Sequence, residues 1–437
     1  MVTSSWSSLR GLSAMRYFLK VYGCQMNRYD GQLIDAILRS SGHKPVNDPE
    51  DAEVIIINTC AVRDHAERRV RGYIRTLPRD KRVAVVGCMA QREGRRLIED
   101  LEVNYVLGPD TYTILPRILT SARRFVATEL DGELYDTVFP SHHGVVAMVT
   151  VMRGCDNWCS YCIVPYVRGR ARSKKAVSIL SEVEHAVSQG AKEVVLLGQD
   201  ITSYRDGRVS LADLLRMVAK IRGLERVRFI TSHPKGVCDH LIKVVAEEDK
   251  ICPHFHLPLQ SGSNRILRLM NRNYTIEEYD DLINQLRKEI PEVGITTDLI
   301  VGFPTETDLD YEATLEEVTR IRFDFAYMFR YSDRPGTAAE ELSPKVSEDE
   351  KKERLNRLIR IQNRITKDKN SSIVGQKKEV LIERKGRRGY LGRTPENTVV
   401  AVQDQVAIGD LVEVEITGIS GWTPVGQRLP SKIHQRS

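Results

Sequence analysis

Three cysteines in the middle of the chain have a spacing that could hold a metal cluster. Cys155, Cys159 and Cys162 come directly after an apolar run, residues 145–152, that is typical of a buried strand. Cysteine thiolates bind iron–sulfur clusters, and closely spaced cysteines are how proteins hold them. Three ligands would leave one iron of a four-iron, four-sulfur (4Fe–4S) cluster without a protein ligand. An open metal position is a place for chemistry.

Zinc is the simpler alternative for the same cysteines. Structural zinc usually has four ligands, supplied by paired C-x-x-C or Cys/His sets. No histidine follows Cys162 at a ligand spacing. The pattern therefore favours an iron–sulfur cluster over zinc.

The bulk composition indicates a globular protein of several domains. The chain has 437 residues, of which 41% are hydrophobic and 28% charged, and it contains no apolar stretch long enough to cross a membrane. Eight cysteines without a signal peptide favour a reducing compartment, the cytoplasm, and metal or redox use. The net charge of +6 is compatible with a polyanionic partner. Residues 1–14 are Ser-rich and are predicted to form a disordered extension.

The first predicted domain, residues 15–140, alternates strands and helices as in a doubly wound α/β fold. Strands are predicted at residues 17–22, 54–58, 83–87 and 105–107. Helices are predicted at residues 27–41, 63–76, 91–101 and 112–122. Cys24, Cys60 and Cys88 each follow one of the first three strands. Because ligands of parallel sheets bind at the carboxyl ends of strands, we expect these cysteines to share a metal site, again with an open position.

The second predicted domain, residues 141–371, continues as a partial (β/α)6 barrel. Its strands are predicted at residues 145–151, 193–197, 227–231, 254–257, 295–301 and 325–331. Its helices are predicted at residues 177–189, 211–222, 239–248, 275–289 and 309–321, followed by a connecting helix at 348–369. Polar, Gly-rich loops follow the inner strands, on the face expected to carry the active site. Cys238 and Cys252 have no such placement and are expected in the core.

The last predicted domain, residues 372–437, reads as a small antiparallel β-barrel. Strands are predicted at residues 379–383, 389–393, 399–402 and 411–416. Arginine and tyrosine gather on it, a mixture that suits phosphate contact and base stacking. The predicted RNA contacts of this domain are Arg387, Arg388, Tyr390 and Arg393.

Several motifs together resemble the radical S-adenosylmethionine (SAM) methylthiotransferases. The resemblance runs from about Met15 to the C-terminus, with a final segment similar to the family's TRAM domain. Besides the central C-x-x-x-C-x-x-C, it rests on Cys-Gln-Met-Asn at 24–27, Asn-Thr-Cys-Ala-Val-Arg at 58–63, Gly-Cys-Met-Ala-Gln at 87–91, Leu-Gln-Ser-Gly-Ser at 259–263 and Gly-Phe-Pro-Thr-Glu-Thr at 302–307.

The resemblance implies two clusters and two SAM molecules, one as methyl donor and one as radical source. Cys155, Cys159 and Cys162 would hold the 4Fe–4S cluster that cleaves SAM to a 5′-deoxyadenosyl radical. Cys24, Cys60 and Cys88 would hold an auxiliary 4Fe–4S cluster carrying the sulfur to be transferred. The predicted SAM contacts are Tyr161, Gly198, Gln199, Asp200, Ser232, Gln260 and Ser261.

The family has three branches that differ in substrate. These are dimethylallyl-adenosine in tRNA, threonylcarbamoyl-adenosine in tRNA, and an aspartate of a ribosomal protein. The motifs at Cys24 and Cys60 match those of the first branch, whereas the run Arg168-Gly-Arg-Ala-Arg172 is slightly more similar to the second. Asp200, Ala171 and Lys174 depart from the usual Asn, Glu and Arg, which affects the expected SAM and substrate contacts rather than the chemistry.

The resemblance thus implies an enzyme that inserts a methylthio group at C2 of N6-(dimethylallyl)adenosine at position 37 of tRNA, next to the anticodon, with threonylcarbamoyl-adenosine as the alternative substrate. An aromatic C–H has no useful acidity, so a cofactor-borne radical is the sufficient route. Arg168, Arg170 and Arg172 are further predicted RNA contacts. An electron donor and a sulfur donor are expected partners, and the protein is expected to be monomeric. The alternative from another class is a non-catalytic iron–sulfur RNA-binding sensor.

Overall fold

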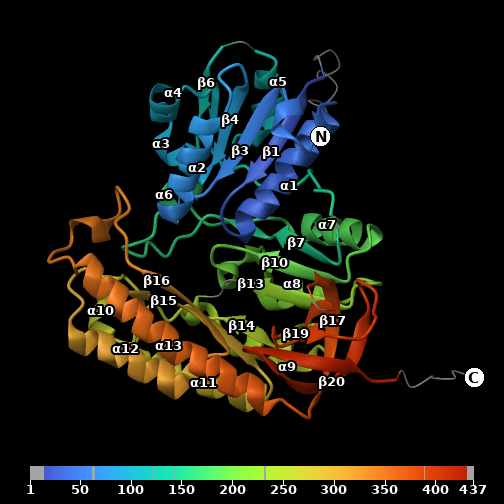
Figure 1. Ribbon diagram of the computed structural model, residues 1–437, viewed down its shortest axis with the longest axis vertical. Helices are drawn as coiled ribbons and strands as arrows, with labels where there is room; N and C mark the ends of the chain where they lie inside the picture. Colours follow the sequence, from blue (N-terminus) through green and yellow to red (C-terminus); the bar gives the residue numbers. More distant parts are fainter. Residues whose placement is uncertain are drawn as a thin grey trace, which may run out of the picture.

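The protein comprises three folded domains along the chain. The computed structural model describes residues 14–430 except 62–63, 122, 143, 231–232 and 388, and only the backbone of 64–66. Nearly all of the predicted N-terminal extension lies outside these residues. Figure 1 shows the N-terminal domain (blue) above the central domain (green to orange), with the C-terminal barrel (red) beside it. Among the described residues, no helix is long and apolar enough to span a membrane.

The N-terminal domain is built on a parallel sheet with the strand order β2-β1-β3-β4-β5-β6. Its strands are β1 (Arg16–Val21), β2 (Lys44–Pro45), β3 (Val54–Thr59), β4 (Arg82–Gly87), β5 (Tyr105–Leu107) and β6 (Phe125–Ala127). Its helices are α1 (Gln25–Ser40), α2 (Asp64–Thr76), α3 (Cys88–Glu93), α4 (Arg96–Leu101) and α5 (Leu115–Leu119), with 3-10 turns η2 (Pro49–Asp51) and η3 (Tyr112–Ile114). Every residue of β3 is buried, as expected of a central parallel strand covered on both faces.

The central domain is a partial barrel of six parallel strands in two groups of three. One group has the order β13-β10-β7 and the other β14-β15-β16. The strands are β7 (Val146–Thr150), β10 (Glu193–Leu197), β13 (Arg226–Ile230), β14 (His254–His256), β15 (Gly294–Val301) and β16 (Phe325–Arg330). Residues 250–252, which precede β14, bond to Val227 of β13 and so connect the two groups.

Helices cover the outer side of this partial barrel. They are α7 (Ala176–Ser188), α8 (Leu211–Ala219), α9 (Asp239–Glu247), α10 (Asn264–Leu269), α11 (Ile276–Glu289), α12 (Asp308–Ile321) and α13 (Glu348–Ser372). Capping boxes start α8, α11 and α12, in each case pairing a Ser or Thr with an acidic residue three positions later. Shorter elements complete the domain: β8 (Met152–Arg153), β9 (Arg172–Ser173), α6 (Val164–Arg168), β11 (Arg205–Asp206), β12 (Val209–Ser210), η4 (Ile201–Ser203), η5 (Pro234–Gly236) and η6 (Ala338–Glu341).

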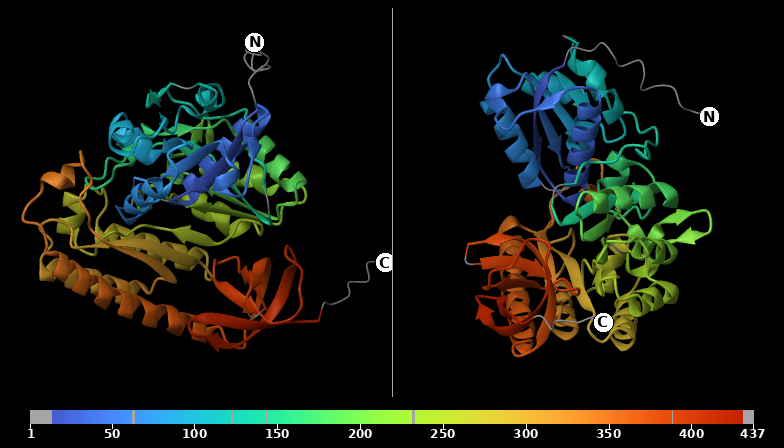
Figure 2. Two further views of the ribbon diagram at one scale, coloured as in Figure 1. Left: turned by 45° about the horizontal axis from the view of Figure 1, so that its top comes forward. Right: turned by 90° about the vertical axis from the view of Figure 1, so that its right-hand side faces the viewer.

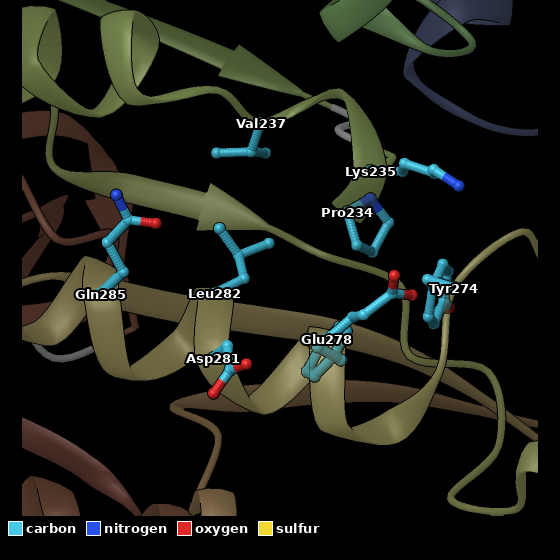
Figure 3. Close-up of a pocket in the computed structure, with 9 residues that line it drawn as sticks. Pro234, Lys235, Val237, Tyr274, Glu278, Asp281, Leu282 and Gln285 are labelled. Atoms are coloured by element: carbon cyan, nitrogen blue, oxygen red, sulfur yellow. The ribbon is translucent and has the colours of Figure 1, made fainter.

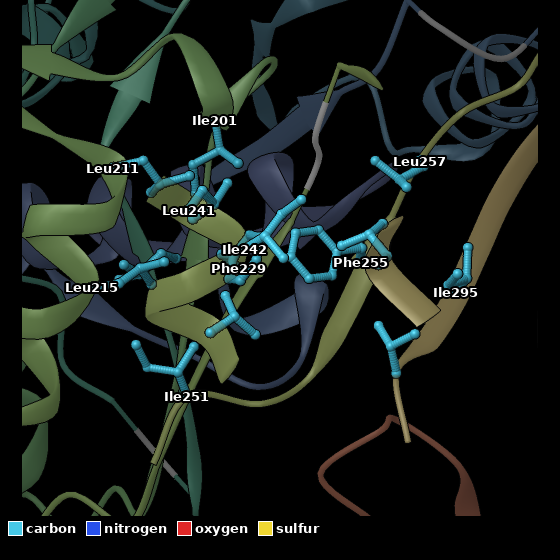
Figure 4. Close-up of a cluster of buried hydrophobic side chains, with 14 of the residues drawn as sticks. Ile201, Leu211, Leu215, Phe229, Leu241, Ile242, Ile251, Phe255, Leu257 and Ile295 are labelled. Atoms are coloured by element: carbon cyan, nitrogen blue, oxygen red, sulfur yellow. The ribbon is translucent and has the colours of Figure 1, made fainter. Parts of the chain in front are cut away.

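The main hydrophobic core lies between the central strands and their helices. Phe229 of β13 and Phe255 of β14 meet edge to face at 5.3 Å between ring centroids, where the two strand groups adjoin (Figure 4). A second core is shared between domains, because Val195 and Leu197 of β10 pack with α1 residues such as Leu33. The N-terminal domain therefore rests on the first strands of the barrel through an apolar contact.

The C-terminal domain is a closed five-stranded barrel with the order β17-β18-β19-β21-β20. Its strands are β17 (Lys377–Gly386), β18 (Gly389–Arg393), β19 (Val399–Val402), β20 (Leu411–Ser420) and β21 (Thr423–Arg428). The β19–β21 pair is parallel and the others are antiparallel. Figure 2 shows α13 running along the outside of the central domain into this barrel.

The C-terminal barrel contacts the strand beginnings of the central domain. Arg226, the first residue of β13, donates hydrogen bonds to the carbonyl of Arg393 at 2.7 Å and the carboxylate of Glu379 at 2.7 Å. Arg228 donates to the carbonyl of Pro395 at 2.9 Å. The barrel is thereby placed at the opposite end of the strands from the expected active-site loops.

The predicted architecture is confirmed, and the differences lie in short elements. The pattern missed several short elements, all of six residues or fewer: β2, β6, β8, β9, β11, β12, β21, α6 and α10. The helix predicted at 91–101 is two short helices, α3 and α4, because the chain breaks at Gly94 with φ +53°.

Candidate functional site: two sets of cysteines on one cavity

The three N-terminal cysteines follow three adjacent strands. Cys24 precedes α1 after β1, Cys60 comes directly after β3, and Cys88 begins α3 directly after β4. Because β1, β3 and β4 are neighbours in a parallel sheet, their carboxyl ends bring the three loops together. A hydrogen bond from Cys60, aided by the charge of Arg168, lowers the pKa of the Cys24 thiol to about 6. The three loops therefore lie at one edge of the sheet, and a metal site shared by their cysteines stays a prediction.

Two asparagines tie these loops to one another. The side-chain amide of Asn27 donates to the carbonyls of Tyr22 and Thr59, each at 2.8 Å. The side-chain amide of Asn58 donates a hydrogen bond to the backbone carbonyl of Asn27 at 2.8 Å. Gly23 has a φ of +115°, and a Cβ there would lie 2.6 Å from the Cβ of Cys60, so only glycine lets the Cys24 and Cys60 loops approach this closely.

Arg168 lies at the N-terminal cysteines and is not on the RNA-facing surface where it was predicted. It is 3% exposed, and its Nε donates to the Sγ of Cys88 at 3.2 Å. Its Nη2 also donates to Asp30 at 2.7 Å and to Asn27 at 3.1 Å. Asp30 is fully buried in α1 and accepts a second bond, also 2.7 Å, from Arg153. An interior role replaces the predicted RNA contact.

The three central cysteines lie on a loop between the short strand β8 and helix α6. The loop closes because the amide of Cys155 donates to the carbonyl of Gly169 at 3.2 Å. Gly154, with φ +78°, is required there, since a Cβ would overlap the carbonyl oxygen of Arg170. The amide of Cys162 donates to the carbonyl of Cys159 at 2.9 Å, which closes a tight turn between these two cysteines.

Residues from later loops support the central cysteines. Asn157 donates to the Sγ of Cys155 at 3.5 Å and to the carboxylate of Asp200 at 2.9 Å. Arg272, 7% exposed, donates to the Sγ of Cys159 at 3.4 Å. Burial raises the pKa of Cys155 to about 11 and that of Cys162 to about 12. These thiols are protonated at neutral pH without a metal, and metal binding would release their protons.

The two cysteine sets supply thiolate sulfur, the usual ligand of 4Fe–4S clusters. Within the described part of the chain, no three Cys, His, Asp or Glu side chains are grouped closely enough to ligate one metal ion. The buried Oε1 atoms of Gln199 and Gln260 have no hydrogen-bond partner. Both follow barrel strands, and Gln260 also lines the large cavity, so its Oε1 fits a bound molecule that carries N–H donors, such as the amino group of SAM.

One large cavity connects both cysteine sets with the C-terminal barrel. Its volume is about 1370 Å³, and its wall includes Cys24 of the first set and Cys162 of the second. Polar barrel residues lining it include His256, Asp298 and Gln260. Arg393, Asn397 and Trp422 of the C-terminal barrel line its other end. The cavity thus runs from the strand ends at the cysteines to the strand beginnings at the C-terminal barrel.

A second, smaller pocket lies between η5 and α11. Its volume is about 290 Å³, and Pro234, Lys235 and Glu278 line it (Figure 3). None of the six cysteines borders this pocket. The large cavity is therefore the candidate site.

Three exposed aromatic side chains in the large cavity were not found from the sequence. Phe325 and Tyr327 of β16 meet edge to face at 5.0 Å between ring centroids and are 46% and 49% exposed. Trp422 of the C-terminal barrel is 58% exposed and lines the same cavity. The sequence shows Phe325 and Tyr327 at alternate positions of a predicted strand. It does not show that the edge of the partial barrel is open there, which leaves both side chains uncovered.

The remaining predicted SAM contacts have different surroundings. Tyr161 lines the cavity beside Cys162. Gly198 is buried against Met152, and Asp200 already accepts bonds from Asn157 and Thr202. Ser232 lies outside the described residues.

Ser261 does not fit its predicted role in SAM binding. It is fully buried, and its hydroxyl lies 3.4 Å from that of Thr314 in α12 and accepts a bond from the amide of Ser263. Its hydroxyl therefore connects the loop to α12.

The other predicted RNA contacts are mostly at the surface. Arg170 and Arg387 are exposed, whereas Arg172 is 19% exposed at its side chain and pairs with Asp110 at 3.0 Å. Arg393 lines the cavity and lies 3.7 Å from Glu383, and Tyr390 packs against the barrel core. Arg388 lies outside the described residues.

Two further expectations can be compared with the structure. Cys252 is buried as predicted, but Cys238 is exposed, because it precedes α9 at the surface. Lys174, one of the unusual residues, forms a buried ion pair with Glu182 at 2.8 Å. That pair holds β9 against α7 and lies apart from the cavity wall.

Three family models match successive parts of the chain. The radical SAM superfamily matches residues 149–318, the uncharacterized protein family UPF0004 matches residues 16–108, and the TRAM domain matches residues 371–423. These matches cover the central, N-terminal and C-terminal domains respectively. The fold and the site thus define a three-domain radical SAM protein.

Named relatives resemble the chain over nearly its whole length. A tRNA-2-methylthio-N(6)-dimethylallyladenosine synthase of Thermodesulfovibrio yellowstonii is 40% identical over 91% of this chain and 95% of its own. A synthase of the same name from Geobacter sulfurreducens is 42% identical over 92% of this chain and 94% of its own. The chain belongs to the family of these synthases, the radical SAM methylthiotransferases.

A solved structure shares the fold. The radical SAM methyltransferase TsrM of Kitasatospora setae, with cobalamin and a 4Fe–4S cluster bound, matches with a TM-score of 0.60 and 14% identity, over 75% of this chain and 77% of its own. At this identity the match concerns the arrangement of the elements.

Proposed function

We propose that the protein inserts a methylthio group at C2 of N6-(dimethylallyl)adenosine at position 37 of tRNA. One observation carries the proposal: a single cavity is bordered by a cysteine of each set and by the TRAM domain. A nucleotide in that cavity can reach both cysteine sets while the TRAM domain holds the neighbouring RNA. Family membership gives the reaction class, and the named relatives give the nucleoside.

Two 4Fe–4S clusters and SAM are the cofactors that this proposal requires. Cys155, Cys159 and Cys162 would hold one cluster, and Cys24, Cys60 and Cys88 the other. When bound and reduced, the first cluster and SAM supply a radical able to break an unactivated C–H bond. An external electron donor and a sulfur donor complete the reaction, and the protein acts as a monomer in the cytoplasm, where tRNA is found.

The residues of this chain position the reactants and exclude water. Gln199 and Gln260 would accept hydrogen bonds from the SAM amino group through their unpartnered Oε1 atoms. Asp200 holds Asn157 against Cys155. Ile230 and Ile300 line the cavity and provide apolar surface that suits a dimethylallyl group. A threonylcarbamoyl group would bring a carboxylate to the same wall.

The substrate base must leave its stack to enter the cavity. This costs least in a single-stranded loop, where aromatic side chains can replace the lost stacking. Phe325, Tyr327 and Trp422 offer such surfaces along the cavity. We also propose that residues 15–140, 141–371 and 372–437 are the functional divisions of the chain.

Reconstituted protein with SAM, dithionite, sulfide and dimethylallyl-tRNA tests the proposal. Mass spectrometry of the digested tRNA should show the 2-methylthio nucleoside. Cys60→Ala should still release 5′-deoxyadenosine but form no methylthio product, whereas Cys155→Ala should lose both. Methylthio product from Cys60→Ala would refute the division between clusters. Absence of 5′-deoxyadenosine from the wild type would favour the non-catalytic sensor.

A further inference from the structure

Each cysteine set contains one sulfur that accepts a hydrogen bond from a buried guanidinium. Arg168 Nε lies 3.2 Å from Cys88 Sγ, and Arg272 Nη1 lies 3.4 Å from Cys159 Sγ. The two arginines are 3% and 7% exposed. They come from different elements, α6 and the segment after α10, yet they have the same relation to their cysteines.

The charges around Arg168 leave one positive charge without a carboxylate. Arg168 and Arg153 both donate to Asp30, each at 2.7 Å. All three side chains are almost completely buried. Two guanidinium groups thus share one carboxylate, and the group keeps a net charge of one positive unit.

Arg272 likewise has no carboxylate partner. Its Nε donates to the Tyr274 hydroxyl at 3.2 Å, and its Nη2 donates to the carbonyl of Pro258 at 3.1 Å. In the part of the chain that the structure describes, no Asp or Glu forms a salt bridge with it. A buried charge is costly unless an opposite charge compensates it. A negative group beside each arginine would remove that cost.

A 4Fe–4S cluster held by three cysteines has the required charge. Its core in the 2+ state together with three thiolates carries one negative unit, and reduction by one electron makes it two. We propose that Arg168 and Arg272 each compensate the charge of one cluster and thereby raise its reduction potential. The inference rests on the proposed two-cluster function. Arg168 and Arg272 are positioning residues, because each acts through a cysteine sulfur.

The sign of the effect follows from the charge that reduction adds. A guanidinium attracts the reduced cluster more strongly than the oxidised one, and hydrogen bonds to the sulfurs act in the same direction. Removing the guanidinium should therefore make reduction harder. Because each arginine contacts only one cysteine set, each substitution should affect one cluster.

Single-cluster forms of the full-length chain separate the two effects. The form Cys24→Ala/Cys60→Ala/Cys88→Ala keeps only the SAM-binding cysteines, and Cys155→Ala/Cys159→Ala/Cys162→Ala keeps only the auxiliary ones. Potentiometric titration with dithionite, monitored by electron paramagnetic resonance without SAM, gives each midpoint potential. Arg272→Met should reduce the equilibrium constant for reduction of the SAM-binding cluster at least tenfold, a shift of about 59 mV for one electron. Arg272→Lys keeps the charge and should shift less.

The matched experiment uses the auxiliary cluster. Arg168→Met should lower its potential in the same way, and Asp30→Asn, which removes a negative charge, should raise it. This opposite sign keeps the test decisive if Arg168→Met fails to fold. In chains that keep all six cysteines and so hold both clusters, each arginine substitution should leave the potential of the other cluster unchanged.

The outcomes distinguish this inference from the proposed function. Four irons in each single-cluster form with unshifted potentials in the variants would overturn the inference and leave the two-cluster function standing. No cluster in the form that keeps Cys24, Cys60 and Cys88 would overturn both. A shift in Arg272→Met that occurs only when SAM is present would show that Arg272 serves SAM, and would also overturn the inference.

Discussion

Asn27→Ala should destabilise the N-terminal domain and prevent the auxiliary site from forming. The Asn27 side chain is fully buried and makes four hydrogen bonds, two from its amide to Tyr22 and Thr59 and two accepted from Arg168 and the Cys24 thiol. Alanine would leave two carbonyl oxygens and one guanidinium N–H without partners. At about 1–3 kcal/mol for each buried group left unpaired, and with partial relaxation, we expect a loss of about 3–5 kcal/mol.

The loss should also appear in the metal content, because these bonds join the Cys24 and Cys60 loops. Urea unfolding followed by circular dichroism measures the free energy, with the midpoint lowered and the slope unchanged. Iron analysis of the form that keeps only the auxiliary cysteines should give well below four irons per chain, the content of one 4Fe–4S cluster. Asn273→Ala, at an exposed position, is the matched control and should change stability by less than about 0.5 kcal/mol. Wild-type stability together with a full cluster in Asn27→Ala would refute the reasoning.

Four further variants test other parts of the structure. Burial lowers the pKa of His233 to about 4 from its ordinary 6.5, so the unfolded chain binds a proton first as pH falls. Stability should therefore decrease from pH 6.5 towards 4 by roughly 3 kcal/mol, and urea titrations of His233→Gln should show a flatter profile. Gly154→Ala should cost about 2–3 kcal/mol and lower the iron bound by the SAM-binding cysteines, because a Cβ overlaps the Arg170 carbonyl; unchanged iron would contradict this. Tyr327→Ala should weaken tRNA binding roughly tenfold in filter-binding assays with the same salt dependence, as for a lost stacking contact, whereas Arg387→Ala should reduce the salt slope by about one.

The site could be predicted in outline because its cysteines follow strands. Each of Cys24, Cys60 and Cys88 lies one to three residues after a strand whose neighbours in the sheet carry the other two. In a parallel sheet this placement is sufficient to bring them together. The same logic predicted the loops of Gln199 and Gln260 at the barrel mouth. The hydrophobic pattern of each strand and the alternation of strands and helices can both be read from local sequence. They were enough to predict this part of the site.

The roles of the arginines could not be predicted, since their partners are distant in sequence. In the run from Arg168 to Arg172, charge alone favours a solvent-exposed basic patch. Asp30 lies 138 residues before Arg168, and Asp110 lies 62 residues before Arg172. Only the packing of the first domain on the second shows that Arg168 is buried while Arg170 remains exposed. Tertiary contacts between domains therefore decided which residues of the run are internal.

The buried group of Arg153, Asp30 and Arg168 also fixes the distance between the two cysteine sets. Arg153 lies two residues before Cys155, Asp30 is in the helix that follows Cys24, and Arg168 bonds to Cys88. Removing one partner from a buried ion pair typically costs about 3–5 kcal/mol, so this connection does not open readily. A substrate base that must be reached from both sets requires a constant separation between them. The buried contacts between the domains supply such a separation, because they join the segments that carry Cys24, Cys88 and Cys155.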